Sequence, residues 1–270
     1  MCGYPKKRLG QNFLIDPNII RKIIKTLALK PSDEILEVGA GRGELSCFIA
    51  PKVKKFYAVE VDKDLIPALR LRIKKYSRKI KIINEDILKI RLEKIFPGRR
   101  KIKVFGNIPY YISTPIIEYL IKYKNKISEA FLTVQKEFAE RIVASVGSKN
   151  YASLSLFVHY YAVPKILFNI KKNCFYPAPQ VDSSFLHLRF KKEVLTSLSL
   201  KNLLFKIIRL SFNYKRKTLK KSLQNLAPAQ EIEEILLQCG KDAKSRPEEL
   251  SLEDFILLTQ KLSQRRVPSF

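Results

Sequence analysis

The stretch that most constrains the fold is Glu-Val-Gly-Ala-Gly-Arg-Gly at residues 37–43, entered from the apolar run Ile35-Leu36. A buried run that ends in alternating glycines and leads into helical periodicity from Leu45 predicts a strand, a tight turn and a helix. Glycines suit such a turn because they have no Cβ to keep a ligand away from the backbone. The sequence therefore predicts a nucleotide-binding turn. A purely structural glycine turn in another α/β protein is the alternative.

The spacing of these glycines narrows the choice of ligand. The dinucleotide fingerprint needs a third glycine three residues after its second, to approach a pyrophosphate, and that position is Glu44 here. Glycines at every second position, with an acidic residue at the end of a later strand, suit a nucleoside without phosphates. S-adenosylmethionine is such a ligand, and we expect it as the cofactor.

Strand-like and helical segments alternate downstream of this turn. The expected strands cover residues 56–60, 80–84, 104–107 and 130–134, and the expected helices cover residues 65–73, 115–123 and 138–146. Such alternation predicts an α/β fold with a mostly parallel, Rossmann-like sheet and helices on both faces. Residues 166–170 and 185–190 are strand-like without a long helix between them, which predicts an antiparallel hairpin at a sheet edge.

Every periodic segment after Lys191-Lys192 is helical, namely residues 200–210, 215–226, 232–238 and 252–262. We therefore expect two domains, an α/β domain with the nucleotide-binding turn over residues 1–190 and a small all-helical domain over residues 191–270. Near the amino terminus, Asp16-Pro17 predicts a helix N-cap followed by proline at the first helical position.

The net charge predicts a polyanionic partner. The chain has 52 Lys and Arg against 25 Asp and Glu, a net charge of +27, which exceeds what solubility requires. A lysine-rich proteome is the alternative, but the charge is unevenly placed. Residues 201–221 contain eight basic residues and no acid, whereas residues 231–254 contain eight acids and three basic residues. This asymmetry predicts one face that binds phosphates and another that faces away from them.

Other bulk features set the expected compartment. No apolar segment approaches the roughly 18 uncharged residues of a membrane span, and residues 1–14 lack the apolar region of a secretion signal. The four cysteines form no Cys-x-x-Cys pair, and the chain has only two histidines. We therefore expect a cytoplasmic protein with reduced thiols, no metal site and no membrane contact.

Polar residues follow the expected strands at the sheet edge where ligands bind in open α/β folds. Glu60 ends the second expected strand, where a carboxylate can accept hydrogen bonds from both hydroxyls of a ribose. Asp86 follows the third strand and is placed to accept a hydrogen bond from an adenine amino group. Solvated acids or helix caps are the alternatives for both residues.

The tetrapeptide Asn107-Ile108-Pro109-Tyr110 begins at the last residue of the expected strand 104–107. An adenine amino group is a poor nucleophile, but an amide oxygen and a backbone carbonyl can hold its hydrogens and turn its lone pair toward an electrophilic methyl. Pro109 makes the backbone rigid, and Tyr110 offers a stacking face for a base taken out of its helix. A sulfonium donor loses its charge as it reacts, so positioning can replace a strong base. An ordinary proline turn with a buried tyrosine is the alternative.

Four segments together resemble the ribosomal RNA adenine dimethyltransferases, and the resemblance runs nearly end to end. They are Leu-Gly-Gln-Asn-Phe-Leu at residues 9–14, the glycine turn, residues 107–110, and Phe-Tyr-Pro-Ala-Pro-Gln-Val-Asp-Ser at residues 175–183. The first of these, with Lys-Thr-Leu at residues 217–219 and Leu-Ser-Leu-Glu-Asp-Phe at residues 250–255, resembles the housekeeping small-subunit branch rather than the antibiotic-resistance large-subunit branch.

The resemblance implies a Rossmann-like S-adenosylmethionine-dependent methyltransferase fold and a role for individual residues. The implied cofactor-binding residues are Asn12, Leu14, Gly39, Gly41, Glu60, Asp86 and Asn107. The implied catalytic residues are Asn107, Ile108, Pro109 and Tyr110, with Phe175 as a second stacking face. Lys215, Arg216 and Lys217 would begin a helix that binds the RNA backbone. The family tends to place arginine at position 215, so lysine there loses the bidentate fork.

The same resemblance implies the reaction. Methyl groups would pass from S-adenosylmethionine, leaving S-adenosylhomocysteine, to two adjacent adenosines near the 3′ end of small-subunit (16S) rRNA in an assembling small subunit. We expect a monomer. Two other functions stay open: a large-subunit rRNA adenine methyltransferase, and a non-catalytic RNA-binding assembly or transcription factor on the same fold. Intact Asn107, Tyr110 and Glu60 favour an enzyme.

Overall fold

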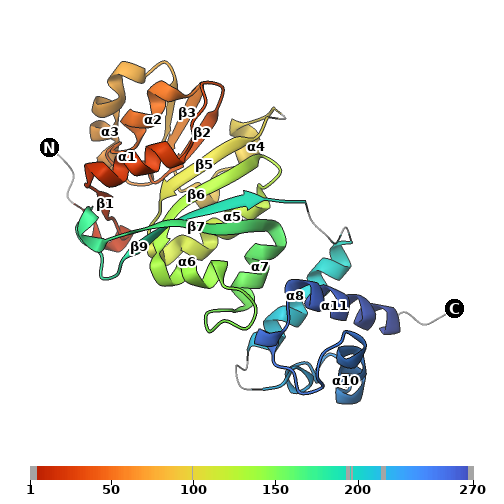
Figure 1. Ribbon diagram of the computed structural model, residues 1–270. Coiled ribbons are helices and arrows are strands. Elements are labelled where there is room, and N and C mark those ends of the chain that lie inside the picture. Colours follow the sequence, from red (N-terminus) through yellow and green to blue (C-terminus); the bar gives the residue numbers. More distant parts are fainter. Residues whose placement is uncertain (1–4, 99, 193–194, 196, 214–216, 267–270) are drawn as a thin grey trace. The chain divides into compact units, whose positions relative to one another are not determined.

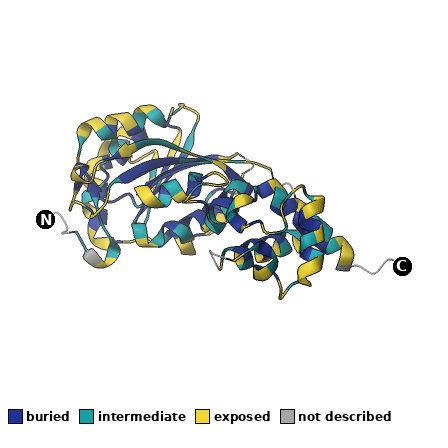
Figure 2. Cartoon of the chain, turned by 60° about the horizontal axis from the view of Figure 1, so that its bottom comes forward, coloured by how far each residue is buried: buried dark blue, intermediate teal, exposed yellow. Residues whose placement is uncertain are grey.

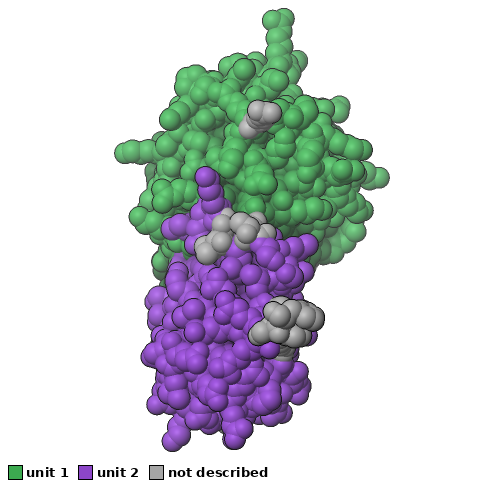
Figure 3. Space-filling model, turned by 90° about the vertical axis from the view of Figure 1, so that its right-hand side faces the viewer, with its two compact units in different colours: residues 1–139, 164–190 green, residues 140–163, 191–270 purple. Residues whose placement is uncertain are grey.

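The computed structural model describes residues 5–98, 100–192, 195, 197–213 and 217–266 (Figure 1). The described chain falls into two compact units, which Figure 3 colours separately. The first unit comprises the chain up to residue 139 together with residues 164–190, and the second comprises residues 140–163 and the chain from residue 191 onward. One division falls at the expected domain boundary. Residues 140–163, which we expected in the first domain, belong to the second unit.

The sheet has the predicted topology. Within the described residues seven strands pair in the order β4-β3-β2-β5-β6-β9-β7. Those running parallel are β2 (Glu34–Val38), β3 (Lys55–Val59), β4 (Ile80–Ile83), β5 (Ile102–Asn107) and β6 (Ile127–Gln135). β9 (Ser183–Phe190) runs antiparallel to β6, and β7 (Ala162–Ile170) lies at the edge. The mostly parallel sheet and its antiparallel edge are therefore confirmed.

Three helices of the first unit share one core with the sheet. They are α1 (Pro17–Thr26), α2 (Ser46–Ile49) and α3 (Ile66–Ile73), which cluster around β2 and β3 (Figure 1). Their apolar side chains meet strand residues such as Ile35, Phe56, Phe105 and Phe131. The strands are mostly buried and the outer sides of the helices are exposed, as Figure 2 shows. Removal of these side chains from water is the main force that holds the strands in place.

The first unit also contains α4 (Leu92–Ile95) and α5 (Ser113–Lys122), which contacts β6. Helix α6 (Lys136–Val143) begins in the first unit and ends in the second. α1 begins as predicted. The Asp16 carboxylate accepts hydrogen bonds from the amides of Asn18 and Ile19, at 2.8 and 3.1 Å, and Pro17 occupies the first turn. This cap satisfies amides that would otherwise lack partners and fixes where the helix leaves the preceding segment.

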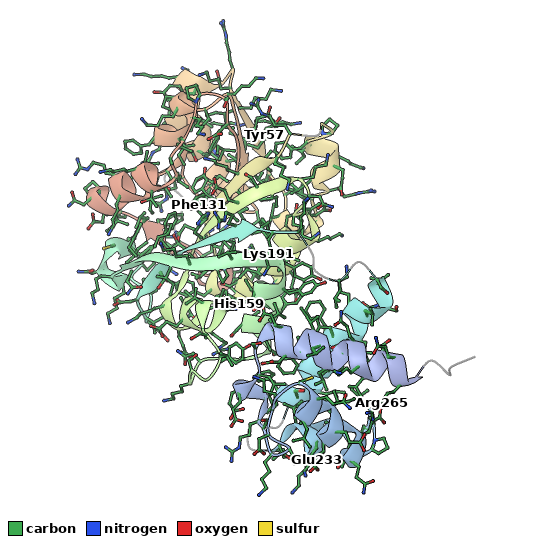
Figure 4. The ribbon with its side chains drawn as sticks, turned by 45° about the vertical axis from the view of Figure 1, so that its right-hand side comes forward. Tyr57, Phe131, His159, Lys191, Glu233 and Arg265 are labelled. Atoms are coloured by element: carbon green, nitrogen blue, oxygen red, sulfur yellow. The ribbon has the colours of Figure 1, made fainter. Side chains whose placement is uncertain are left out.

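The second unit is helical. It contains α7 (Ser153–Tyr161), α8 (Leu198–Phe212), α9 (Leu219–Ser222), α10 (Ala229–Gln238) and α11 (Leu252–Arg266). Figure 4 shows His159 on α7, Glu233 on α10 and Arg265 on α11. Within the described part of the chain, no helix has the length and apolar character needed to cross a bilayer.

One helix prediction in this unit is wrong, and one helix of the unit was not predicted. The helix expected over residues 215–226 is, among the described residues, only the turn Leu219–Ser222. Thr218 is extended, the amide of Leu219 donates to the carbonyl of Ser245, and the chain turns again before Pro228. Helix α7 was not predicted. Its residues are apolar or aromatic on nearly every side, so they give little of the periodicity that reveals a helix.

Gly106 on β5 pairs with Val38 on β2. A Cβ atom at Gly106 would lie 2.5 Å from the carbonyl oxygen of Val38. One residue further along each strand, the position of a Cβ at Gly39 is 3.4 Å from the carbonyl oxygen of Asn107. Glycine at position 106 therefore lets the glycine turn and Asn107 adjoin.

We predict that Gly106→Ala lowers the free energy of unfolding by about 1–3 kcal/mol, the usual cost of overpacking a buried site. Chemical denaturation of both proteins measures this difference. Gly98→Ala is the control, because no described heavy atom lies within 4 Å of a Cβ built there. Equal stability of the two variants would contradict the close approach of the strands.

Candidate active site

A pocket opens at the carboxyl ends of β2, β3 and β5, entirely within the first unit. It encloses about 980 Å³ of space, including solvent at its mouth. Its lining includes the residues that the sequence singled out, namely Asn12, Leu14, Gly39, Gly41, Glu60, Asp86, Asn107, Ile108, Pro109 and Tyr110. Parallel pairing explains this gathering, because the ends of neighbouring parallel strands meet at one edge of the sheet.

The glycine turn forms one wall of the pocket. Gly39 has φ +73° and Gly41 has φ +57°, conformations that residues with a Cβ rarely adopt. The amides of Gly39 and Ala40 both donate to the carbonyl of Val59, at 2.9 and 3.0 Å, which ties the turn to the end of β3. A Cβ at Gly41 would lie 3.2 Å from the ring of Phe13. Both the backbone conformation and the close packing therefore require glycine at this turn.

Glu60 follows β3 and is 5% exposed. Its Oε2 accepts from the amide of Gly41 at 2.7 Å, and its Oε1 accepts from the amide of Asp62 at 2.8 Å. Burial raises the pKa of this carboxyl, and the two amide hydrogen bonds oppose that effect. Each carboxylate oxygen has a second lone pair, so Glu60 can still accept hydrogen bonds from a diol in the pocket.

Asn107 and Tyr110 are both held by hydrogen bonds. The side-chain nitrogen of Asn107 donates to the carbonyl of Asn12 at 2.7 Å. Within the described residues its Oδ1 accepts no hydrogen bond, so this oxygen is the acceptor that the amide can offer to a ligand. The hydroxyl of Tyr110 lies 2.6 Å from the Oγ of Ser183 on β9, and burial raises the pKa of this phenol. The tyrosine ring is thus anchored at its far end.

Asp86 lines the pocket and also caps a short helix. Its Oδ1 accepts from the amide of Leu88 at 3.0 Å, which is the capping alternative considered for this acid. Phe175 does not belong to the pocket lining. It lies on β8 (Phe175–Tyr176), paired with β1 (Phe13–Leu14), and its side chain is buried in the core of the first unit at 3% exposure. A stacking role for Phe175 stays a prediction, and it requires the ring to become accessible.

The predicted RNA-binding residues are Lys215, Arg216 and Lys217. Lys215 and Arg216 lie outside the described residues. Lys217 is exposed and precedes α9.

Glu37 was given no role from the sequence, yet it lines the pocket at 2% exposure. Its Oε2 accepts a hydrogen bond from the hydroxyl of Ser46. Burial raises the pKa of Glu37 well above its usual value, the Ser46 hydroxyl opposes this, and the charges of Glu44 and Glu60 add to it. The sequence did contain a signal for this residue, because Glu37 is an acid within the apolar run Ile35-Leu36-Glu37-Val38.

The raised pKa of Glu37 makes the free energy of unfolding depend on pH. Its folded pKa lies above the unfolded value, so the folded protein binds more protons and its stability falls as pH rises above about 4.5 through the folded pKa. Glu37→Gln keeps the shape and an acceptor for Ser46 but does not titrate. We expect the free energy of unfolding of the wild type, relative to this variant, to fall with pH by at most about 1.4 kcal/mol per pH unit.

Denaturation of both proteins at several pH values measures that difference. A difference that stays constant across the range would show that the burial of Glu37 carries no proton linkage.

Comparison with known proteins agrees with this geometry. Residues 4–264 match the family model described as Ribosomal RNA adenine dimethylase. Ribosomal RNA small subunit methyltransferase A of Lachnoclostridium phytofermentans is 40% identical over 267 residues, 96% of this chain and 92% of the relative.

Two crystal structures show the same fold. The dimethyladenosine transferase from Plasmodium falciparum has a TM-score of 0.78 at 26% identity, covering 94% of this chain and 98% of that one. The 23S rRNA methyltransferase ErmE has a TM-score of 0.75 at 24% identity, covering 94% and 100%, and this likeness concerns the fold alone. The family model matches nearly the whole length of the chain, and the motifs of the chain line the pocket described above. The chain therefore belongs to the ribosomal RNA adenine dimethylase family.

Proposed function

We propose that this protein transfers methyl groups from S-adenosylmethionine to the exocyclic amines of two adjacent adenosines near the 3′ end of small-subunit (16S) rRNA. The observation that carries the proposal is the meeting of the glycine turn and Asn107 in one pocket, with the Asn107 amide oxygen left as an acceptor. Membership of the dimethylase family supports this chemistry. The relative that is 40% identical is named for the small subunit, which favours that target over the large subunit.

The pocket residues divide into those for the cofactor and those for the base. The Glu60 carboxylate would accept hydrogen bonds from the ribose hydroxyls, and Asp86 would accept one from the adenine amino group of the cofactor. Gly39 and Gly41 present bare backbone to it, and Asn12 and Leu14 also line the pocket. When bound, the cofactor supplies an electrophilic methyl on a sulfonium that becomes neutral as the methyl leaves.

The residues at the end of β5 and just after it would orient the target amine. The Oδ1 of Asn107 and the carbonyl of Ile108 can accept its two hydrogens, which turns the nitrogen lone pair out of the ring plane. Tyr110, anchored at its hydroxyl, offers a face on which the extruded base stacks. The nitrogen gains the methyl and releases one proton to solvent, so orientation supplies most of the catalysis.

The second methyl transfer makes a different demand. One hydrogen remains on the amine after the first transfer, so only one of the two acceptors can be used. The pocket must also hold a methyl group where a hydrogen was. We further propose that the natural substrate is the assembling small subunit. The proposal also includes a cytoplasmic location and a monomeric state.

Methyl transfer to isolated subunits tests the function. The protein is incubated with labelled S-adenosylmethionine and with small or large subunits that lack the modification. We expect label in 16S rRNA at adenosine N6. Label in 23S rRNA would support the large-subunit alternative, and no label in either RNA would support a non-catalytic factor.

Two substitutions of Asn107 sharpen the same assay. Asn107→Ala removes the acceptor for the target amine, and we expect methyl transfer to fall by about 10²-fold or more, as when one preorganised catalytic hydrogen bond is lost. Asn107→Asp keeps an acceptor at that position but loses the donor to Asn12, so it should retain more activity than the alanine variant. Full activity of Asn107→Ala would refute the role assigned to this amide.

The basic run at residues 215–217 would bind phosphates. Replacing all three residues by alanine should weaken RNA binding and reduce the slope of log K against log salt by about two, at about 0.7 per lost contact with single-stranded RNA. Fluorescence anisotropy at several salt concentrations measures the slope. The control replaces Lys241, Lys244 and Arg246 by alanine, which removes three positive charges from the acidic residues 231–254. Equal slopes for both triple variants would place the RNA-binding surface elsewhere.

A further inference from the structure

The segment of residues 6–14, which we call the N-terminal strap, contributes Leu9 to Leu14 to the lining of the pocket. It is fixed on one side by the hydrogen bond from Asn107 to the carbonyl of Asn12. The ring of Phe13 packs under the guanidinium of Arg42, 4.5 Å from its carbon, beside the glycine turn. The strap then enters β1, which pairs with β8. A ligand in this pocket would therefore lie between the strap and the ends of the strands.

Asp62 fixes the strap on its other side. Its Oδ1 receives the ammonium of Lys6 at 2.6 Å, and its Oδ2 accepts from the side-chain nitrogen of Gln11 at 2.9 Å. The amide of Lys6 in turn donates to the Oε1 of Gln11 at 2.8 Å, so the two strap residues also hold each other. Asp62 itself is 4% exposed. Both of its carboxylate oxygens thus bind the same short segment of chain.

The backbone amide of Asp62 forms a hydrogen bond with Glu60 and not with the strap. Its amide donates to the Oε1 of Glu60 at 2.8 Å, so one residue joins the strap to the carboxylate proposed for the ribose. Burial alone would raise the pKa of Asp62, but the hydrogen bonds from Lys6 and Gln11 outweigh it and hold the pKa below its usual value. The carboxylate is therefore charged at neutral pH and keeps both strap contacts.

We propose that Asp62 is a positioning residue that fastens the N-terminal strap over bound cofactor and orients the Glu60 carboxylate, and thereby sets how tightly the cofactor is bound. This inference rests on the proposed function. It assigns Asp62 a role in the retention of the cofactor rather than in the chemical step.

The variant Asp62→Asn tests the contribution of the Asp62 carboxylate separately from that of its backbone amide. Asparagine has nearly the same shape and keeps the backbone amide that donates to Glu60, but its side-chain nitrogen cannot accept from Gln11 or Lys6. Asp64→Asn is the matched control. Asp64 also binds the Lys6 ammonium, at 2.6 Å, but its side chain is 54% exposed, and exposed ion pairs contribute little.

Calorimetry with S-adenosylhomocysteine and the full chain, without RNA, measures the effect. We expect Asp62→Asn to raise the dissociation constant by about tenfold, the cost of one lost hydrogen bond to a charged group. Asp64→Asn should change it by less than about twofold. In the methylation assay, Asp62→Asn should raise KM for the donor while kcat at saturating donor stays close to wild type.

A second variant separates this role from a general loss of stability. Gln11→Leu removes a strap contact without altering Asp62, and it should raise the same dissociation constant. In the double variant with Asp62→Asn the effects should be less than additive, because both act through one hydrogen bond. Additive effects, or a dissociation constant of Asp62→Asn within about twofold of wild type, would overturn the inference.

The outcomes also separate this inference from the proposed function. A wild-type protein that does not bind S-adenosylhomocysteine would overturn both. A wild type that binds it and methylates rRNA, beside an Asp62→Asn variant with unchanged binding and an unchanged KM for the donor, would overturn the role of Asp62 alone.

Discussion

The parallel pairing of β2 with β5 is the constraint on which the rest of the pocket depends. Val38 pairs with Gly106, so the glycine turn that follows β2 and Asn107 at the end of β5 lie next to each other although they are far apart in the sequence. This spacing exists because position 106 has no side chain to push the strands apart. The flanking helices α1 to α3 and their apolar contacts hold the strands in that register.

The second constraint is electrostatic. Buried carboxyls are costly unless they are paired or protonated, and the structure resolves this differently at Glu37, Glu60 and Asp62. Glu37 accepts a hydrogen bond from a serine hydroxyl and has a raised pKa. Glu60 accepts hydrogen bonds from backbone amides, and Asp62 binds a lysine and a glutamine side chain. The buried acids around the proposed cofactor site therefore each have a partner or a raised pKa that offsets the cost of burial.

Local signals in the sequence predicted most of the sheet and its flanking helices. The strands, the Asp16 cap of α1 and the antiparallel edge were predicted because alternation, capping residues and apolar runs act over a few neighbouring residues. The prediction was wrong for the helix at residues 215–226, where a hydrogen bond from Leu219 to the distant Ser245 replaces a helical one. It also omitted α7, whose burial within its unit depends on packing rather than on its own pattern.

By itself, the sequence determined the fold class, the glycine turn, the polar residues at the strand ends and the family that they resemble. Those features follow from the chemistry of neighbouring residues. Only the tertiary structure decided that Glu37 is buried against Ser46, that Phe175 lies in the core and that Lys6 and Gln11 meet at Asp62. Such contacts join residues that are far apart in the chain, and their energies depend on burial and distance, which no local pattern encodes.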